Sequence, residues 1–273
     1  MADTIKNASV QMHKTEQQLR DDVVQVGRLM FDKGWIAAND GNISIRLDDD
    51  RLLATPTGVS KGMLRPDDLI VCNLSGDKLC GERERTSEMG MHLAIYQNRP
   101  DIRAVVHAHP PVATGFATAG RALNLALLPE VVISLGSVPL ADYGLPGTPA
   151  LIEGMLPYIP KYDAILMANH GAVAYGEDVL QAYSRMEIVE HFARITMVAE
   201  LLGGPKVLPR VEVQKLFDSR ERYHVQSKNR FESGSPMTAE DMPETPETNE
   251  KIEITRDQLV AIVEEALKVR GVF

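Results

Sequence analysis

Three histidines stand at the ends of apolar runs in an arrangement that could bind a metal ion. Residues 104–106 are apolar and partly β-branched, which predicts a buried strand that delivers His107 and His109 at its end. In an extended chain, residues i and i+2 face the same side about 7 Å apart, so both imidazoles could contact one ion. A second apolar run, 164–168, leads to His170. Three imidazoles with one open position are the ligand pattern of catalytic zinc.

A His-x-His pair on its own is weak evidence for a metal site, because packed or surface histidines are more common. The interpretation gains weight from His170, which follows its strand in a similar setting. Two buried strands would then each present imidazole at one end. The sequence therefore predicts a metal site built from His107, His109 and His170.

A carboxylate that could move protons stands at a predicted helix start. Thr86-Ser87-Glu88 opens the helix, with Thr86 or Ser87 as the expected N-cap and Glu88 in the first turn. Without context, Glu88 is an ordinary carboxylate at a helix N-terminus. His92 follows four residues later on the same helix face, and we interpret it as a histidine near the site with no assigned role.

Two loops could bind an anion. Residues 55–62 (TPTGVSKG) are rich in hydroxyls and glycine, so their N–H and O–H groups could surround a phosphate. The spacing of glycine and lysine is not that of a P-loop, and an ordinary turn is the alternative. Gly41-Asn42 precedes a strand as a turn that can expose backbone N–H groups.

The elements that must position these residues alternate between helix and strand. Thr15 and Gln18 form a capping-box pattern at the start of a helix over residues 15–33. The further predicted elements are strands at 43–46, 52–55, 69–72, 131–135 and 164–168, a hairpin at 74–80, helices at 86–98, 150–158 and 177–202, and a partly helical stretch within 110–127. This alternation predicts an α/β domain with a mixed or antiparallel sheet flanked by helices.

Composition narrows the class of protein. The 273 residues, 44% of them hydrophobic, suit one domain of about 200 residues with an extension, or two small domains. A formal charge of -9 without a basic run argues against nucleic acid or anionic membrane as a partner. We expect no membrane helix, no signal peptide within residues 1–14, and a cytoplasmic location. Cys72 and Cys80 are the only cysteines, so no disulfide framework is expected.

Five short motifs occur in the order and approximate spacing of the class II sugar-phosphate aldolases. They are Gly41-Asn42-Ile43-Ser44, Thr55-Pro56-Thr57-Gly58, Thr86-Ser87-Glu88, His107-Ala108-His109 and Asn169-His170-Gly171. The chain resembles this family over about residues 15–205, and within it the L-fuculose-phosphate aldolases most. The resemblance implies one zinc-dependent aldolase domain, a central sheet flanked by helices, assembled as a homotetramer with sites at subunit interfaces.

The resemblance also implies roles for single residues. His107, His109 and His170 would be the zinc ligands. Glu88 would be the catalytic acid/base, and a fourth ligand in the empty site. The substrate phosphate would be held by Gly41, Asn42, Thr57, Gly58, Thr86 and Ser87.

The implied reaction is retro-aldol cleavage of a sugar phosphate. A ketose 1-phosphate, either L-fuculose or L-rhamnulose 1-phosphate, would give dihydroxyacetone phosphate and L-lactaldehyde. The family's tyrosine from the neighbouring subunit has no counterpart around residues 127–131, and Tyr143 lies further on. Methylthioribulose-1-phosphate dehydratases share the three histidines and a nearby glutamate, so they remain an alternative. Ribulose-phosphate epimerases carry Asp where Glu88 stands, and adducin-like binding domains lack the metal site.

The C-terminal part has a different composition. We expect the aldolase domain over residues 1–225, a flexible acidic and proline-rich linker over 226–251, and an amphipathic helix over 252–273. Leu259, Ile262 and Val263 fall at helical spacing in that last segment. It could pack on its own oligomer. It also resembles the encapsulation peptides that dock enzymes to bacterial microcompartment shell proteins.

Overall fold

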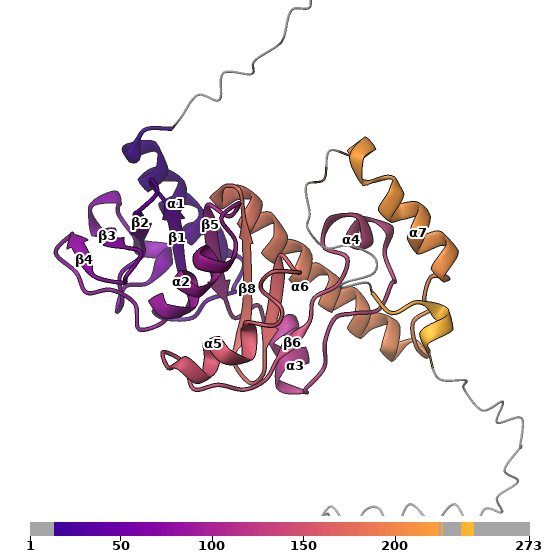
Figure 1. Cartoon of the computed structure of the whole chain (residues 1–273). Helices are drawn as coiled ribbons and strands as arrows, with labels where there is room; N and C mark the ends of the chain where they lie inside the picture. Colours follow the sequence, from indigo (N-terminus) through magenta and orange to yellow (C-terminus); the bar gives the residue numbers. More distant parts are fainter. Residues whose placement is uncertain (1–13, 224, 226–235, 243–273) are drawn as a thin grey trace, which may run out of the picture. The chain divides into compact units, whose positions relative to one another are not determined.

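The computed structural model describes residues 14–223, 225 and 236–242, and their core is one sheet of eight strands. The strands are β1 (Asn42–Arg46), β2 (Arg51–Ala54), β3 (Ile70–Asn73), β4 (Lys78–Cys80), β5 (Ala104–Ala108), β6 (Leu140–Ala141), β7 (Ala164–Met167) and β8 (Gly171–Gly176). Their order across the sheet is β4-β3-β2-β1-β5-β8-β7-β6 (Figure 1). Only β6 and β7 run parallel, so the predicted mixed, largely antiparallel sheet is confirmed.

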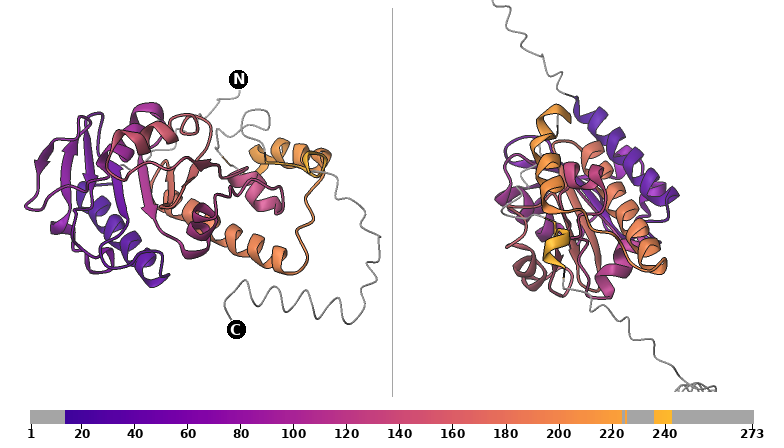
Figure 2. Two further views of the ribbon diagram at one scale, coloured as in Figure 1. Left: turned by 90° about the horizontal axis from the view of Figure 1, so that it is seen from below. Right: turned by 90° about the vertical axis from the view of Figure 1, so that its right-hand side faces the viewer.

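Helices cover both faces of this sheet. They are α1 (Glu16–Asp32), α2 (Met89–Asn98), α3 (Pro111–Thr118), α4 (Pro129–Ser134), α5 (Pro149–Met155), α6 (Val179–Leu201) and α7 (Arg210–Asp218). Helices α1, α3 and α6 pack on one face, and α2 and α5 on the other (Figure 2). Within the described ranges, none of these helices combines the length and the hydrophobicity needed to cross a membrane.

Strand alternation divides the core into two layers. Val106 of β5 packs in the layer of α1 and α6, whereas its neighbour Val105 packs in the layer of α2. His107 has the parity of Val105 and therefore points toward α2. The capping box predicted for α1 is present: Thr15 Oγ1 accepts from the N–H of Gln18, whose side chain accepts from the N–H of Thr15.

Two sequence predictions are wrong. The expected strand at 131–135 is helix α4, because Pro129 fixes the first-turn geometry of a helix and Val132 packs on Val213 of α7. Its β-branched residues suggested a strand, but packing against α7 decides the outcome. The N-cap of α2 is Glu88, so Thr86 and Ser87 lie outside the helix.

Part of the predicted linker is described. Met237 exchanges backbone hydrogen bonds with Asn124 and Ala126, and Glu240 accepts from the N–H of Arg210. Residues 236–241 therefore lie along the α4–α7 part of the chain. The predicted C-terminal helix at 252–273 lies outside the described residues, and it and the boundaries of the linker stay predictions.

Candidate metal and active site

The three predicted histidines lie together at one end of the two central strands. His107 is on β5, His109 follows β5, and His170 is in the turn from β7 to β8. Because β5 pairs with β8 so that Ala108 faces Ala172, the end of one strand lies beside the turn that opens the other. One nitrogen from each imidazole lies within 4.8 Å of the other two, and the Nε2 atoms of His107 and His109 are 3.2 Å apart.

The turn that carries His170 approaches β5 closely. A Cβ atom added to Gly171 would lie 2.5 Å from Cδ2 of His109 and 2.6 Å from the carbonyl oxygen of Ala108. Asn169 has a φ of 54°, in the left-handed region that asparagine tolerates better than most residues. The Asn-His-Gly sequence thus lets the turn bring His170 against the end of β5.

Glu88 completes the cluster from the start of α2. Its Oε1 lies 3.1 Å from Nε2 of His170, and its Oε2 lies 3.4 Å from Nε2 of His107. Several buried polar side-chain atoms of the described residues have no hydrogen-bond partner, and two of them, Glu88 Oε1 and His170 Nδ1, lie in this cluster. A buried carboxylate facing imidazole nitrogens fits a bound cation, because the cation would neutralise the converging lone pairs.

The outer nitrogens of two histidines are held by neighbours. Nδ1 of His107 donates to the carbonyl of Ala172 over 2.9 Å, so its Nε2 presents a lone pair toward the cluster. Nδ1 of His109 lies 3.5 Å from a carboxylate oxygen of Asp40. This outer support fixes the tautomer and orientation of metal-binding imidazoles in proteins.

Burial and neighbouring charges determine the protonation states of His107, His109 and Glu88. Desolvation lowers the pKa of both His107 and His109, so both imidazoles are neutral at neutral pH, as metal ligands must be. Burial alone would raise the pKa of Glu88, but its interactions with His107 and His170 and a hydrogen bond from Asn42 bring that pKa below its usual range. Glu88 is therefore ionised.

The six predicted phosphate-binding residues separate into two groups. Thr57, Gly58 and Ser87 are exposed, and the N–H of Thr57 donates to the carbonyl of Glu84, four residues before Glu88. The other three are buried: Gly41, Asn42 and Thr86.

The side-chain amide of Asn42 is engaged inside the protein. It donates to Oε2 of Glu88 over 2.8 Å and to Oγ1 of Thr86 over 3.4 Å. Gly41 has a φ of 68°, and a Cβ there would lie 2.8 Å from the carbonyl of His107. The Gly41-Asn42 turn therefore packs on β5 and presents its amide to Glu88.

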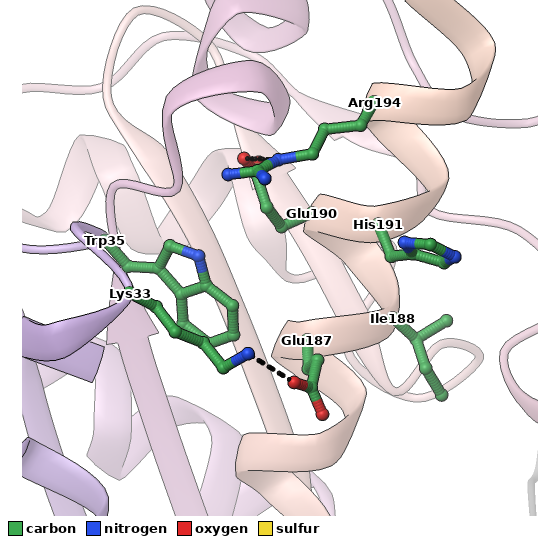
Figure 3. Close-up of a pocket in the computed structure, with 7 residues that line it drawn as sticks. All are labelled: Lys33, Trp35, Glu187, Ile188, Glu190, His191 and Arg194. Carbon is green, nitrogen blue, oxygen red and sulfur yellow. Dashed lines mark hydrogen bonds and ion pairs between the residues drawn. The ribbon is translucent and has the colours of Figure 1, made fainter. Parts of the chain in front are cut away.

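Two clefts flank this region. One of about 320 Å³ is lined by the Glu88 end of α2, Arg85, Ser87 and Thr148. A wider cleft of about 530 Å³ lies between Trp35 and α6 (Figure 3). In it, Lys33 pairs with Glu187 and Arg194 pairs with Glu190.

Two residues that line the wider cleft, Trp35 and Glu190, accept hydrogen bonds from the backbone at His109 and just after it. The carbonyl of Trp35 accepts from the N–H of His109 over 2.9 Å. The carboxylate of Glu190 accepts from the N–H groups of Val112 and Ala113, at the start of α3. Sequence reasoning did not find Glu190, since only the packing of α6 on α3 brings it there.

His92 is a further residue whose place the sequence did not reveal. It is buried on α2, with Nε2 2.5 Å from Oδ1 of Asn42 and Nδ1 2.6 Å from Oγ of Ser44. The one signal available was its position four residues after Glu88. The ring nitrogens of His92 have Asn42 and Ser44 of β1 as hydrogen-bond partners, and Asn42 is the register partner of His107 on β5.

Comparison with known proteins gives consistent matches. The family described as Class II Aldolase and Adducin N-terminal domain matches residues 21–197. A 3-oxo-tetronate 4-phosphate decarboxylase of Pectobacterium atrosepticum is 35% identical over 197 residues, 71% of this chain and 88% of the relative. A 5-deoxy-D-ribulose 1-phosphate aldolase of Bacillus thuringiensis is 33% identical over 208 residues, 76% of this chain and 97% of the relative. A solved L-fuculose 1-phosphate aldolase superposes with a TM-score of 0.70 at 28% identity, covering 77% of this chain and 99% of that one.

Proposed function

The chain belongs to the family described as Class II Aldolase and Adducin N-terminal domain, and we propose that it is a metal-dependent lyase that cleaves a ketose 1-phosphate by a retro-aldol reaction. The substrate would be L-fuculose or L-rhamnulose 1-phosphate, and the products dihydroxyacetone phosphate and L-lactaldehyde. One observation carries the proposal: three imidazole nitrogens and the carboxylate of Glu88 converge on one point.

The donor set fits zinc. His107, His109 and His170 would be the ligands, and Glu88 would occupy the fourth position when no substrate is bound. Imidazole ligands add no charge of their own, so they would leave a bound ion its full charge, and Oε1 of Glu88, which has no hydrogen-bond partner, would gain one. When bound, zinc would stabilise the negative charge that develops beside the substrate carbonyl.

Glu88 would move the proton. In cleavage, the C4 hydroxyl loses its proton, the C3–C4 bond breaks with its electron pair passing to C3, and C3 is then protonated. An ionised carboxylate can accept the hydroxyl proton, and once protonated it can deliver a proton to C3. Asn42 holds Oε2 through a hydrogen bond, which leaves Oε1 available for this transfer.

The substrate phosphate would bind on the exposed loops. Thr57, Gly58 and Ser87 can offer hydroxyl and backbone N–H groups to an anion, with Gly41, Asn42 and Thr86 packed behind them. The positive φ of Gly58 (72°), with open space around its Cα, lets the loop backbone face a ligand. A phosphate held there anchors the substrate through a group remote from the bond that breaks.

Decarboxylation of a 3-oxo acid 4-phosphate is the second candidate, favoured by the decarboxylase relative at 35% identity. Both reactions break a carbon–carbon bond beside a carbonyl and leave negative charge on the phosphorylated fragment. They differ in the proton demand, because decarboxylation releases CO₂ without removing a hydroxyl proton. The carbanion left by either reaction must be protonated, a step in which Glu88 could serve both, so the two candidates are separated by their products, dihydroxyacetone phosphate or CO₂.

The test is turnover by purified, zinc-loaded protein. L-fuculose, L-rhamnulose and 5-deoxy-D-ribulose 1-phosphates are assayed for dihydroxyacetone phosphate, and 3-oxo-tetronate 4-phosphate for CO₂. We expect release of dihydroxyacetone phosphate that disappears in Glu88→Gln and His107→Ala and persists in His191→Ala, an exposed histidine on α6. Fully zinc-loaded protein that releases neither product would refute the proposal, and CO₂ alone would establish the second candidate.

Two partner proposals rest on the sequence. The first is a homotetramer, tested by the mass of the purified protein in solution. The second is that residues 252–273 dock to a microcompartment shell protein, which would confine a reactive aldehyde product. A fluorescent protein fused to residues 250–273 should form foci in cells that make shells, and diffuse fluorescence there would contradict docking.

A further inference from the structure

We propose that His92 is a positioning residue that orients Glu88 through Asn42. This inference rests on the proposed function, in which Glu88 transfers the proton. Hydrogen-bonded side chains form one line that begins at the partly buried Glu88 and runs into the protein interior: Glu88, Asn42, His92, Ser44 and Tyr96.

This line of hydrogen bonds can form because two residues along a strand and four residues along a helix span nearly the same distance. Asn42 and Ser44 are two residues apart on β1, a separation of about 6.6 Å along an extended chain. His92 and Tyr96 are four residues apart on α2, a rise of about 6 Å along a helix. With α2 packed along β1, polar groups from the two elements alternate, so each side chain from one element lies between two from the other.

The hydrogen bonds of this line have one direction. The NH₂ group of Asn42 donates to Oε2 of Glu88, and the amide oxygen of Asn42 faces Nε2 of His92. Nε2 of His92 therefore carries the proton and donates to Asn42. Nδ1 of the neutral ring accepts from the hydroxyl of Ser44, whose oxygen accepts from the hydroxyl of Tyr96.

Burial keeps the direction fixed. Asn42, Ser44, His92 and Tyr96 are each at most 3% exposed and are surrounded by the apolar layer of α2 and α5. Desolvation lowers the pKa of His92 to about 4, so the ring stays neutral at physiological pH. An unpaired polar group is costly in such surroundings. Flipping the amide of Asn42 or the ring of His92 would therefore break hydrogen bonds along the whole line.

As a consequence, the two carboxylate oxygens of Glu88 have different roles. Oε2 is tied to Asn42, whose amide is itself held by His92 and Thr86. Oε1 has no hydrogen-bond partner among the described residues and faces Nε2 of His170. The line therefore fixes the carboxylate plane and leaves one named atom, Oε1, to exchange the proton.

The experiment compares two replacements of His92 in the zinc-loaded enzyme. His92→Phe keeps a planar ring but removes the donor to Asn42, whereas His92→Gln keeps an N–H that can reach it. We expect His92→Phe to lower kcat by about 10–100-fold, the range typical of groups that orient active-site ligands, with KM and zinc content nearly unchanged. His92→Gln should recover most of kcat, which a purely structural role would not produce.

A double-mutant cycle with Asn42→Ala tests whether His92 acts through Asn42. If it does, adding His92→Phe to Asn42→Ala causes no further loss of kcat, because the intermediary is already gone. Independent, multiplicative losses would overturn the proposal, as would a folded His92→Phe enzyme with normal kcat. Tyr96→Phe, at the far end of the line, is the matched control and should lower kcat less than His92→Phe.

A measurement without substrate separates this inference from the proposed function. The ¹⁵N shifts of the His92 ring in the wild-type protein should show a neutral imidazole protonated at Nε2, with His92→Gln used to assign the signals. A His92 ring that carries its proton on Nδ1, or that is charged at neutral pH, would overturn the inference even if the enzyme is active. Because this measurement uses the wild-type protein, it also decides the matter if His92→Phe fails to fold. An inactive wild type with the expected tautomer would refute the function alone.

Discussion

Replacing Gly171 by alanine should damage the metal site through a single methyl group. The added Cβ would lie 2.6 Å from the carbonyl oxygen of Ala108 and 2.5 Å from Cδ2 of His109. Both distances are far below van der Waals contact. The methyl group can be accommodated only if the His170 turn moves off β5 or the ring of His109 rotates away.

The magnitude follows from overpacking. Inserting a methyl group into a close-packed site costs about 1–3 kcal/mol of unfolding free energy. For a domain of this size, each kcal/mol lowers Tm by about 2–4 °C. Displacement of one of three ligands should in addition weaken zinc binding by about 10–100-fold, comparable to the loss of an orienting neighbour.

The assay is thermal unfolding with and without zinc, together with a competition titration against a zinc chelator. Gly115→Ala in α3 is the matched control, because no atom lies within 4 Å of its added Cβ and its backbone is helical. That control should be neutral or slightly stabilising. If Gly171→Ala unfolded at the wild-type temperature and bound zinc with wild-type affinity, the close approach of the turn to β5 would be refuted.

Two further predictions concern buried charges. Burial lowers the pKa of Lys61 from 10.5 to about 8, so between these pH values the unfolded chain holds a proton that the folded chain lacks, and unfolding free energy rises with pH. Denaturant titrations should show this rise in the wild type and a flatter one in Lys61→Met. Asp163 is fully buried between Arg99 and Arg185, so Asp163→Ala should cost about 3–5 kcal/mol in the same titrations, whereas the exposed Asp49→Ala should cost nothing measurable. A loss below 1 kcal/mol at Asp163 would contradict the assigned pairing.

The gathering of the three histidines could be predicted because His107 lies at the end of an apolar strand, His109 follows that strand and His170 follows another. His107 and His109 share a face by the period of an extended chain, and His170 has the same relation to β7. The pairing of β5 with β8, which brings the two groups together, has no local signal. β8 itself was not predicted, since its short sequence begins and ends with glycine and contains two alanines.

Residues that act through tertiary contacts could not be assigned from the sequence. His92 gains its place only when α2 docks on β1, and Asn42 turns its amide to Glu88 for the same reason. The prediction of a strand at 131–135 was wrong for a different reason, because a local signal for the correct structure was present. There, a β-branched run outweighed Pro129, the local signal that does mark the first turn of α4.

The pairing of the central strands also bears on the order of folding. His107 and the carbonyl that holds its ring are 65 residues apart in the chain, and Asn42 and Glu88 are 46 apart. Contacts between such distant segments carry a high loop-closure cost and tend to form late. The proposed ligand set would therefore be incomplete until the centre of the sheet has closed. We expect zinc to slow unfolding far more than it speeds folding, so that the bound ion would govern the lifetime of the native state.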